Sequence, residues 1–200
     1  MTLGEVCILN RALDGKDIHS MPGFAILDMS GIAASKYKNS LIGKGLLETH
    51  SSFTEKGLQT TKLIRDYKNA KKYITVMGFV LGTVDDSSAV ALSRDDNGYA
   101  FTLVDIEGSV KQLGGAYKFL SLDAPYEVEE CPFWFDEVIQ MYKPDIDNSF
   151  SIMTEKGNDV THEAFFTDGE SILVYDFKRK MLRQMGSGSV KELLMERMVV

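Results

Sequence analysis

The sequence is poor in the residues that build disulfide scaffolds and membrane spans. Among its 200 residues are 2 cysteines, Cys7 and Cys131, which stand far apart with no partner at metal-ligand or redox spacing. This usage favours buried thiols in a reducing compartment over a disulfide or a nucleophile. The longest apolar run, Ile74–Leu81, is too short to span a bilayer, and Met1–Glu5 lacks the basic residues that begin a signal peptide. We therefore expect a cytoplasmic protein without direct membrane insertion.

Positive charge is also scarce. The 22 Lys and Arg residues are outnumbered by 29 Asp and Glu residues, which gives a formal net charge of −7. Because nonspecific affinity for nucleic acid requires clustered cations, this balance disfavours nucleic acid as a partner. Hydrophobic residues make up 44% of the chain, enough for a full core without disulfides or metals, so the length fits one domain or two fused half-domains.

Catalytic motifs are missing. The sequence has no Gly-x-Ser-x-Gly nucleophile motif, no zinc-ligand cluster and no EF-hand pattern. Two acidic doublets could bind a hard cation, although their positions in predicted hairpin turns favour hydrogen bonds to the local backbone. They are Asp85, Asp86, Asp95 and Asp96. We predict a protein that is not an enzyme and has no cofactor or metal, and a metal-dependent enzyme built on these carboxylates is the third alternative.

The chain contains an internal repeat. Tyr99–Leu120 and Ser171–Leu194 follow one plan, in which Asp105 corresponds to Asp176. Each copy predicts strands that end in a hairpin, followed by a glycine and a short helix, with Val110–Gly114 as the last strand of the first copy. Two halves of this kind usually share one sheet, because neither buries its apolar face alone.

The repeat predicts the fold class. We expect an α+β protein with a pseudo-two-fold central antiparallel sheet and helices packed on it. Residues 1–200 then form a single pseudo-symmetric domain, with half one at about 1–122 and half two at about 123–200. In this arrangement Leu103 and Leu113 are expected to point into the same core as Val174 and Met185 of half two, or the strand neighbours of these residues.

Four further helices are predicted. Apolar residues near helical spacing indicate helices at Leu3–Leu13 and Leu27–Lys44. Ser52 and Glu55 predict a capping box for a long helix that reaches about Tyr73. Pro132 suits the first turn of another helix, which ends before Pro144.

The segment Gly31–Gly57 suggests an alternative function. Its sequence, "GIAASKYKNSLIGKGLLETHSSFTEKG", resembles winged-helix regulators, in which a helix is followed by a Gly-Leu-Leu strand, a short wing and "TEKG". The resemblance implies that Lys36, Lys38 and Lys44 contact phosphates. The other interpretation of the segment is a packing element with its lysines in solvent.

A second resemblance covers nearly all 200 residues. Its most specific piece is "THEAFFTDGESILVYDF" at Thr161–Phe177, and the next is "SSAVALSRDDNGYAF", which ends at Phe101. With a Leu-rich N-terminal helix and a "GLL" segment before a long helix, this order resembles the EspG-like family of type VII (ESX) secretion chaperones, and is most similar to its firmicute EsaE-type members. The family has a quasi-two-fold fold with helical bundles on a central antiparallel sheet, which agrees with the repeat.

The family resemblance implies a chaperone or adaptor. Such proteins bind a secreted helical-hairpin protein or toxin in the cytosol, keep it soluble and help to target it to the secretion machinery, with the secretion ATPase as a further partner. A partner's amphipathic helix needs a groove with apolar anchors and a polar rim.

Five apolar residues are candidates for contact with the partner. Three of them are consecutive on the helix predicted after Pro132, so they cannot all face one core stripe, and two flank the turn near Pro22. They are Phe133, Trp134, Phe135, Met21 and Phe24. Packing between sheet and helices is the alternative role for these side chains.

Overall fold

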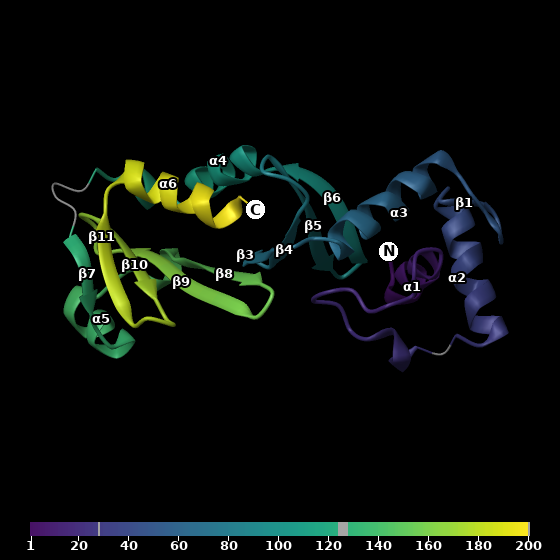
Figure 1. Ribbon diagram of the computed structural model, residues 1–200, viewed down its shortest axis with the longest axis horizontal. Helices are drawn as coiled ribbons and strands as arrows, with labels where there is room; N and C mark the ends of the chain where they lie inside the picture. The colour runs from purple at the N-terminus through teal and green to yellow at the C-terminus, as the bar shows by residue number, and fades with distance from the viewer. Residues whose placement is uncertain (28, 124–127, 200) are drawn as a thin grey trace.

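The computed structural model describes residues 1–27, 29–123 and 128–199. In this part of the chain the largest element is a nine-stranded sheet with the order β6-β5-β4-β3-β8-β9-β10-β11-β7, and its neighbouring strands pair antiparallel. Helices pack on the sheet, and Figure 1 shows the elongated molecule that results. The predicted α+β class is confirmed. The strands are β3 (Tyr73–Val76), β4 (Phe79–Thr83), β5 (Ser88–Asp95), β6 (Gly98–Asp105), β7 (Val128–Pro132), β8 (Phe150–Lys156), β9 (Asp159–Thr167), β10 (Ile172–Asp176) and β11 (Met181–Met185).

The sheet has the predicted pseudo-two-fold arrangement. β3 to β6 form one run that leads into α4 (Ile106–Ala116), and β8 to β11 form a second run that leads into α6 (Ser187–Met198). β3 and β8 pair antiparallel at the centre of the sheet, so an approximate two-fold axis between them relates the two runs. The repeated unit is therefore four antiparallel strands followed by one helix.

The register of the repeat differs from the predicted one. Asp105 is the N-cap of α4, where its side chain accepts a hydrogen bond from an amide of the first helical turn. Asp176 instead ends β10 and accepts hydrogen bonds from two amides of the β10–β11 turn. The predicted equivalence of these two residues is wrong, as is the predicted strand at Val110–Gly114, which lies inside α4. An aspartate serves a helix N-cap and a tight turn by the same side-chain-to-backbone hydrogen bond, so the two sites have similar local sequences.

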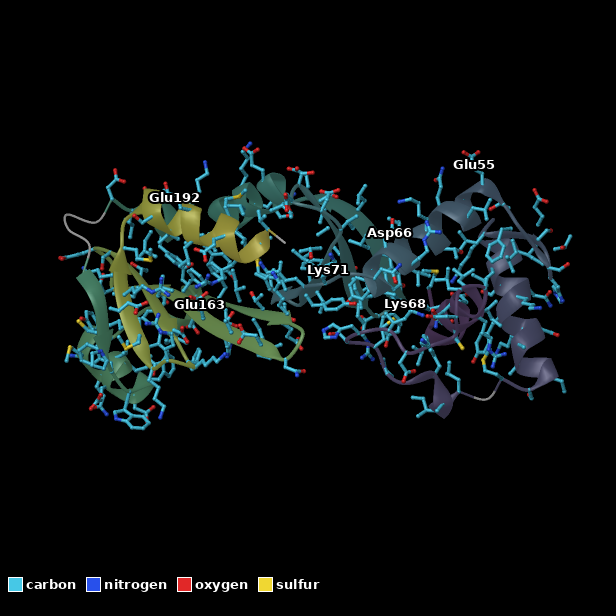
Figure 2. All side chains as sticks on the ribbon, in the orientation of Figure 1. Glu55, Asp66, Lys68, Lys71, Glu163 and Glu192 are labelled. Atoms are coloured by element: carbon cyan, nitrogen blue, oxygen red, sulfur yellow. The ribbon has the colours of Figure 1, made fainter. Side chains whose placement is uncertain are left out.

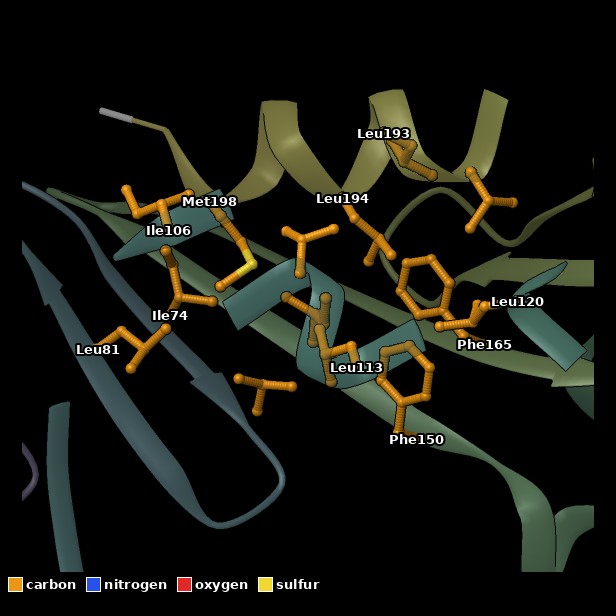
Figure 3. Close-up of a cluster of buried hydrophobic side chains, with 14 of the residues drawn as sticks. Ile74, Leu81, Ile106, Leu113, Leu120, Phe150, Phe165, Leu193, Leu194 and Met198 are labelled. Atoms are coloured by element: carbon orange, nitrogen blue, oxygen red, sulfur yellow. The ribbon is translucent and has the colours of Figure 1, made fainter. Parts of the chain in front are cut away.

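The two equivalent helices cover the same face of the sheet. α4 and α6 lie side by side above the strands, and the central core fills the layer beneath them (Figures 1 and 3). Leu113 lies in this core with Val174, as predicted. Leu103 is 58% exposed, because it faces the other side of edge strand β6, and the core position belongs to its neighbour Val104. The prediction for Leu103 is therefore wrong.

Two separate cores lie on the opposite face. On half one, helices α1 (Leu3–Arg11) and α3 (Glu55–Lys68) cover Val90 and Leu92 of β5, whereas Ala89 and Ala91, which alternate with them, face the central core. On half two, α5 (Phe135–Tyr142) covers the strands in the same way. The period of two along each strand explains why these strands are apolar on both sides.

The N-terminal segment forms three helices and a short hairpin. In chain order these elements are α1 (Leu3–Arg11), α2 (Gly31–Gly43), β1 (Leu47–Thr49), β2 (Ser52–Phe53) and α3 (Glu55–Lys68). The prediction of a helix within Leu3–Leu13 is confirmed. The long helix begins later than predicted, after the N-cap Thr54, and ends at Lys68 rather than near Tyr73, because the chain enters β3 there.

Close backbone packing locks the hairpin against α3. A Cβ atom at Gly57, in the first turn of α3, would collide with the backbone carbonyl of Leu46. Only glycine allows the helix to approach the hairpin this closely.

Cys7, a residue of α1, lies in the N-terminal core, where burial raises the pKa of its thiol.

The aromatic run before α5 is not helical throughout. Pro132 is the last residue of β7, Phe133 lies in the connection, Trp134 is the N-cap, and α5 begins at Phe135. The prediction that three consecutive aromatic residues share one helix is therefore wrong. Strand pairing of Pro132 with Met181 occupies the segment that was predicted as the first helical turn.

Candidate functional site

An apolar groove lies beside α4 on the face that carries the central core. Strands β4, β5 and β6 form its floor, α4 forms one wall, and Met198 at the end of α6 also lines it. Its volume is about 420 Å³ and its lining is mostly apolar, as in typical ligand and partner sites. We call it the α4 groove. Its lining includes Phe79, Ser93, Thr102, Ser109, Gln112 and Ala116.

One stripe of α4 forms the wall of the groove. Ser109, Gln112, Leu113 and Ala116 follow the spacing i, i+3, i+4, i+7, which places them on one face of the helix. Leu113 is buried in the central core, whereas Ala116 is exposed. The small side chains of Ser109 and Ala116 leave room for another backbone to approach α4. Sequence reasoning missed this wall because the segment was interpreted as a strand.

The floor runs from the central core outward to exposed apolar side chains. Leu81 is buried and lies at one end of the cluster in Figure 3. Phe79, two residues earlier on the same face of β4, is 47% exposed. It follows a tight turn in which Met77 and Gly78 both have positive φ, and Met77 is also exposed. An aromatic and a methionine side chain thus stand open at the mouth of the groove.

Three polar side chains in the groove have hydrogen-bonding capacity to spare. Ser93, Thr102 and Gln112 make no side-chain hydrogen bond to another residue in the described part of the chain. A few polar groups in an apolar lining fix the orientation of a bound group. The α4 groove therefore has both an apolar surface and donors and acceptors for a partner.

The equivalent place in half two is filled. Arg197 stands as far from the N-cap of α6 as Ala116 does from the N-cap of α4. Two nitrogens of the Arg197 guanidinium donate to Glu163 on β9 at 2.7 and 3.0 Å. Glu163 is 1% exposed, accepts a further hydrogen bond from Arg183 at 3.2 Å, and lies beneath α6 in Figure 2. An ionic cluster thus fills in half two the space that is open in half one.

The five predicted contact residues lie outside the α4 groove. Phe24 is buried in the N-terminal core and Met21 packs against it. Phe133 and Phe135 pack on the core beneath α5, which agrees with the alternative role for them, packing between sheet and helices. Trp134 alone among these residues is largely open, at 60% exposure, with the Lys180 ammonium 3.7 Å from its ring centre.

One aspartate of each acidic doublet accepts hydrogen bonds within its own turn. Hydrogen bonds from Ser87 and Ser88 lower the pKa of Asp85 to about 2. Asp95 accepts a hydrogen bond from the Asn97 amide at 2.8 Å. Within the described ranges, no group of three or more His, Cys, Asp and Glu residues is arranged to hold a metal ion.

The segment Gly31–Gly57 forms α2, the β1–β2 hairpin and the first turn of α3. Of its three candidate lysines, Lys44 is not available to bind a phosphate. The Lys44 ammonium binds both carboxylate oxygens of the buried Glu5 at 2.6 and 2.7 Å. Lys36 and Lys38 have no ion-pair partner in the described residues.

A family model described as "Domain of unknown function (DUF5081)" matches residues 1–199. The chain belongs to this family. No curated protein matches the sequence. Among the described residues of this DUF5081 protein, no helix has both the length and the apolar character needed to cross a membrane.

Proposed function

We propose that this DUF5081 protein is a cytoplasmic chaperone or adaptor for a secreted helical-hairpin protein or toxin of a type VII secretion system. It keeps the substrate soluble and aids its targeting, with the secretion ATPase as a further partner. The observation that carries the proposal is the open α4 groove on a pseudo-symmetric sheet. A non-catalytic binding role also fits acidic turns whose carboxylates are engaged by the backbone.

Co-expression tests this function. The protein is produced together with each secreted helical-hairpin protein encoded beside its gene, and a tag on the DUF5081 chain is used for purification. We expect one such protein to co-purify in a stable ratio and to lose secretion when the DUF5081 gene is deleted. Secretion that is unchanged in the deletion strain, together with no co-purifying partner, would refute the proposal.

The second candidate is a winged-helix DNA-binding regulator. It is favoured by one observation, the β1–β2 hairpin between α2 and α3. This function requires duplex binding with a steep salt dependence, weakened by Lys36→Glu. The absence of any mobility shift with upstream promoter fragments at low salt would exclude it.

A further inference from the structure

The α4 groove has the shape of a site for one helix. α6 already packs along one side of α4, and the groove lies along the other side, above β4 to β6. A helix placed there would continue the layer formed by α4 and α6 across the uncovered part of the sheet. The open stripe on α4, with Ser109 and Ala116 at its ends, allows the close axial approach that helix packing needs.

Both ends of the groove carry negative charge. At one end, the hairpin beyond the lining residue Ser93 carries Asp95 and Asp96, whereas Arg94 lies over the ring of Tyr99, which packs in the N-terminal core on the opposite face. At the other end, Asp105 follows the lining residue Val104. None of these three carboxylates has an ion-pair partner within the described residues.

Further carboxylates lie beyond the second end. Asp105 pairs in the sheet with Ser88, which follows the turn that carries Asp85 and Asp86, and these two line a separate hollow together with Lys71. The nearest lysine on α4, Lys111, is held by Glu107 at 2.8 Å and so adds little positive potential. The apolar floor therefore lies between two acidic ends.

We infer that the α4 groove binds an amphipathic α-helix of a partner protein whose apolar stripe is bordered at both ends by Lys or Arg. The apolar stripe packs on Phe79 and the α4 wall, and the terminal cations lie near the acidic ends, which favours encounter and fixes register. Ser93, Thr102 and Gln112 can bind polar groups at the edge of the stripe. This inference rests on the proposed function, in which the helix belongs to the secreted substrate.

In half two, Arg197 fills the site equivalent to the α4 groove, and an arginine placed in half one therefore tests the inference. Ala116→Arg places at the open site the residue type that fills the equivalent site on α6. Gly115→Arg is the matched control, because Gly115 is exposed on the same helix, faces open space and receives the same charge. Both variants are first checked for an unchanged thermal melt. If Ala116→Arg does not fold, Phe79→Ser replaces it.

The probes are two synthetic helices of about five turns, or about 18 residues each. They share one Leu/Ala stripe and end either in lysines or in glutamates, and their affinities are measured by fluorescence anisotropy. We expect the Lys-ended peptide to bind at least tenfold more tightly than the Glu-ended one. Ala116→Arg should weaken the binding of the Lys-ended peptide at least tenfold, whereas Gly115→Arg should change its affinity less than twofold. Asp96→Lys should reduce the preference for lysine ends.

Equal affinities of the two peptides, or equal effects of the two arginine variants, would overturn the inference. Binding of myristate that is blocked by Ala116→Arg, without any peptide binding, would overturn it in favour of an acyl chain. The co-expressed substrate separates this inference from the proposed function. If the substrate co-purifies undiminished with Ala116→Arg, the function stands and the groove assignment fails. If the Lys-ended peptide binds in the groove but no secreted substrate co-purifies, the groove assignment stands and the secretion function fails.

Discussion

Replacement of Glu163 by glutamine should destabilise the protein strongly. Glu163 accepts three charge-assisted hydrogen bonds, two from Arg197 and one from Arg183, and these tie α6 and β11 to β9. Glutamine keeps the volume and one acceptor, but it removes the only buried charge of the cluster. The two partly exposed guanidinium groups keep weaker counter-ions, Glu130 at 3.2 Å for Arg183 and the exposed Glu196 at 2.9 Å for Arg197.

The magnitude follows from these contacts. Loss of two of the three bonds at roughly 1.5–3 kcal/mol each gives at least about 3 kcal/mol. Breaking one side of a buried ion pair costs about 3–5 kcal/mol in general, so we expect a loss of about 3 kcal/mol for Glu163→Gln. For a chain of this size that corresponds to a fall in Tm of roughly 6–12 °C.

Urea unfolding followed by far-UV circular dichroism measures the loss. The control is Glu192→Gln, an exposed carboxylate on α6 that should change the free energy of unfolding by less than about 0.5 kcal/mol. A double-mutant cycle with Arg197→Met should give a coupling of about 1 kcal/mol or more between Glu163 and Arg197. A loss below about 1 kcal/mol for Glu163→Gln, or additive effects in the cycle, would show that the cluster does not hold α6 on the sheet.

Three further predictions concern the rest of the chain. Burial raises the pKa of Glu5, but the hydrogen bonds that Glu5 accepts outweigh this effect and hold its pKa below the ordinary 4.5. The ionised carboxylate therefore stabilises the folded protein above pH 4.5, and this stabilisation is lost as the pH falls through the pKa of the folded state. Urea titrations should accordingly show that Glu5→Gln is destabilising at pH 7 and that its difference from wild type shrinks below about pH 4.5. Gly57→Ala should cost about 2 kcal/mol or more in the free energy of unfolding, because its methyl group meets a backbone carbonyl, whereas Gly43→Ala, which faces open space, should be neutral or slightly stabilising. The fragments 1–123 and 124–200 should not fold separately, and cooperative melting of both alone would show two ordinary domains rather than a single pseudo-symmetric one.

Several local elements of this fold could be predicted from the sequence. The hairpin at Asp96–Gly98, the helix within Leu3–Leu13 and the existence of a repeat follow from short-range rules, since turn chemistry, capping and apolar spacing act over a few residues. These rules also predict the α+β class, because two incomplete halves require a shared sheet. They do not assign the register of the repeat, as the different roles of Asp105 and Asp176 show.

The candidate site could not be predicted from the sequence, because the exposure of a side chain depends on tertiary packing. Aromatic composition directed attention to Phe133, Trp134 and Phe135, but exposure depends on which strands and helices stand above each side chain, and only Trp134 is left largely open. The α4 groove arises because Ala116 occupies a position where the equivalent helix has Arg197.

The amino-acid sequence by itself determined the local elements, the lack of long apolar segments and the duplicated plan of this protein. The tertiary structure alone decided how the copies align about the axis between β3 and β8, and that one copy is closed by an ionic cluster while the other remains open. The physical reason is range in sequence: helix, turn and capping hydrogen bonds join residues a few positions apart, whereas strand pairing across the centre of the sheet and the space left as a groove involve elements that are distant in the chain.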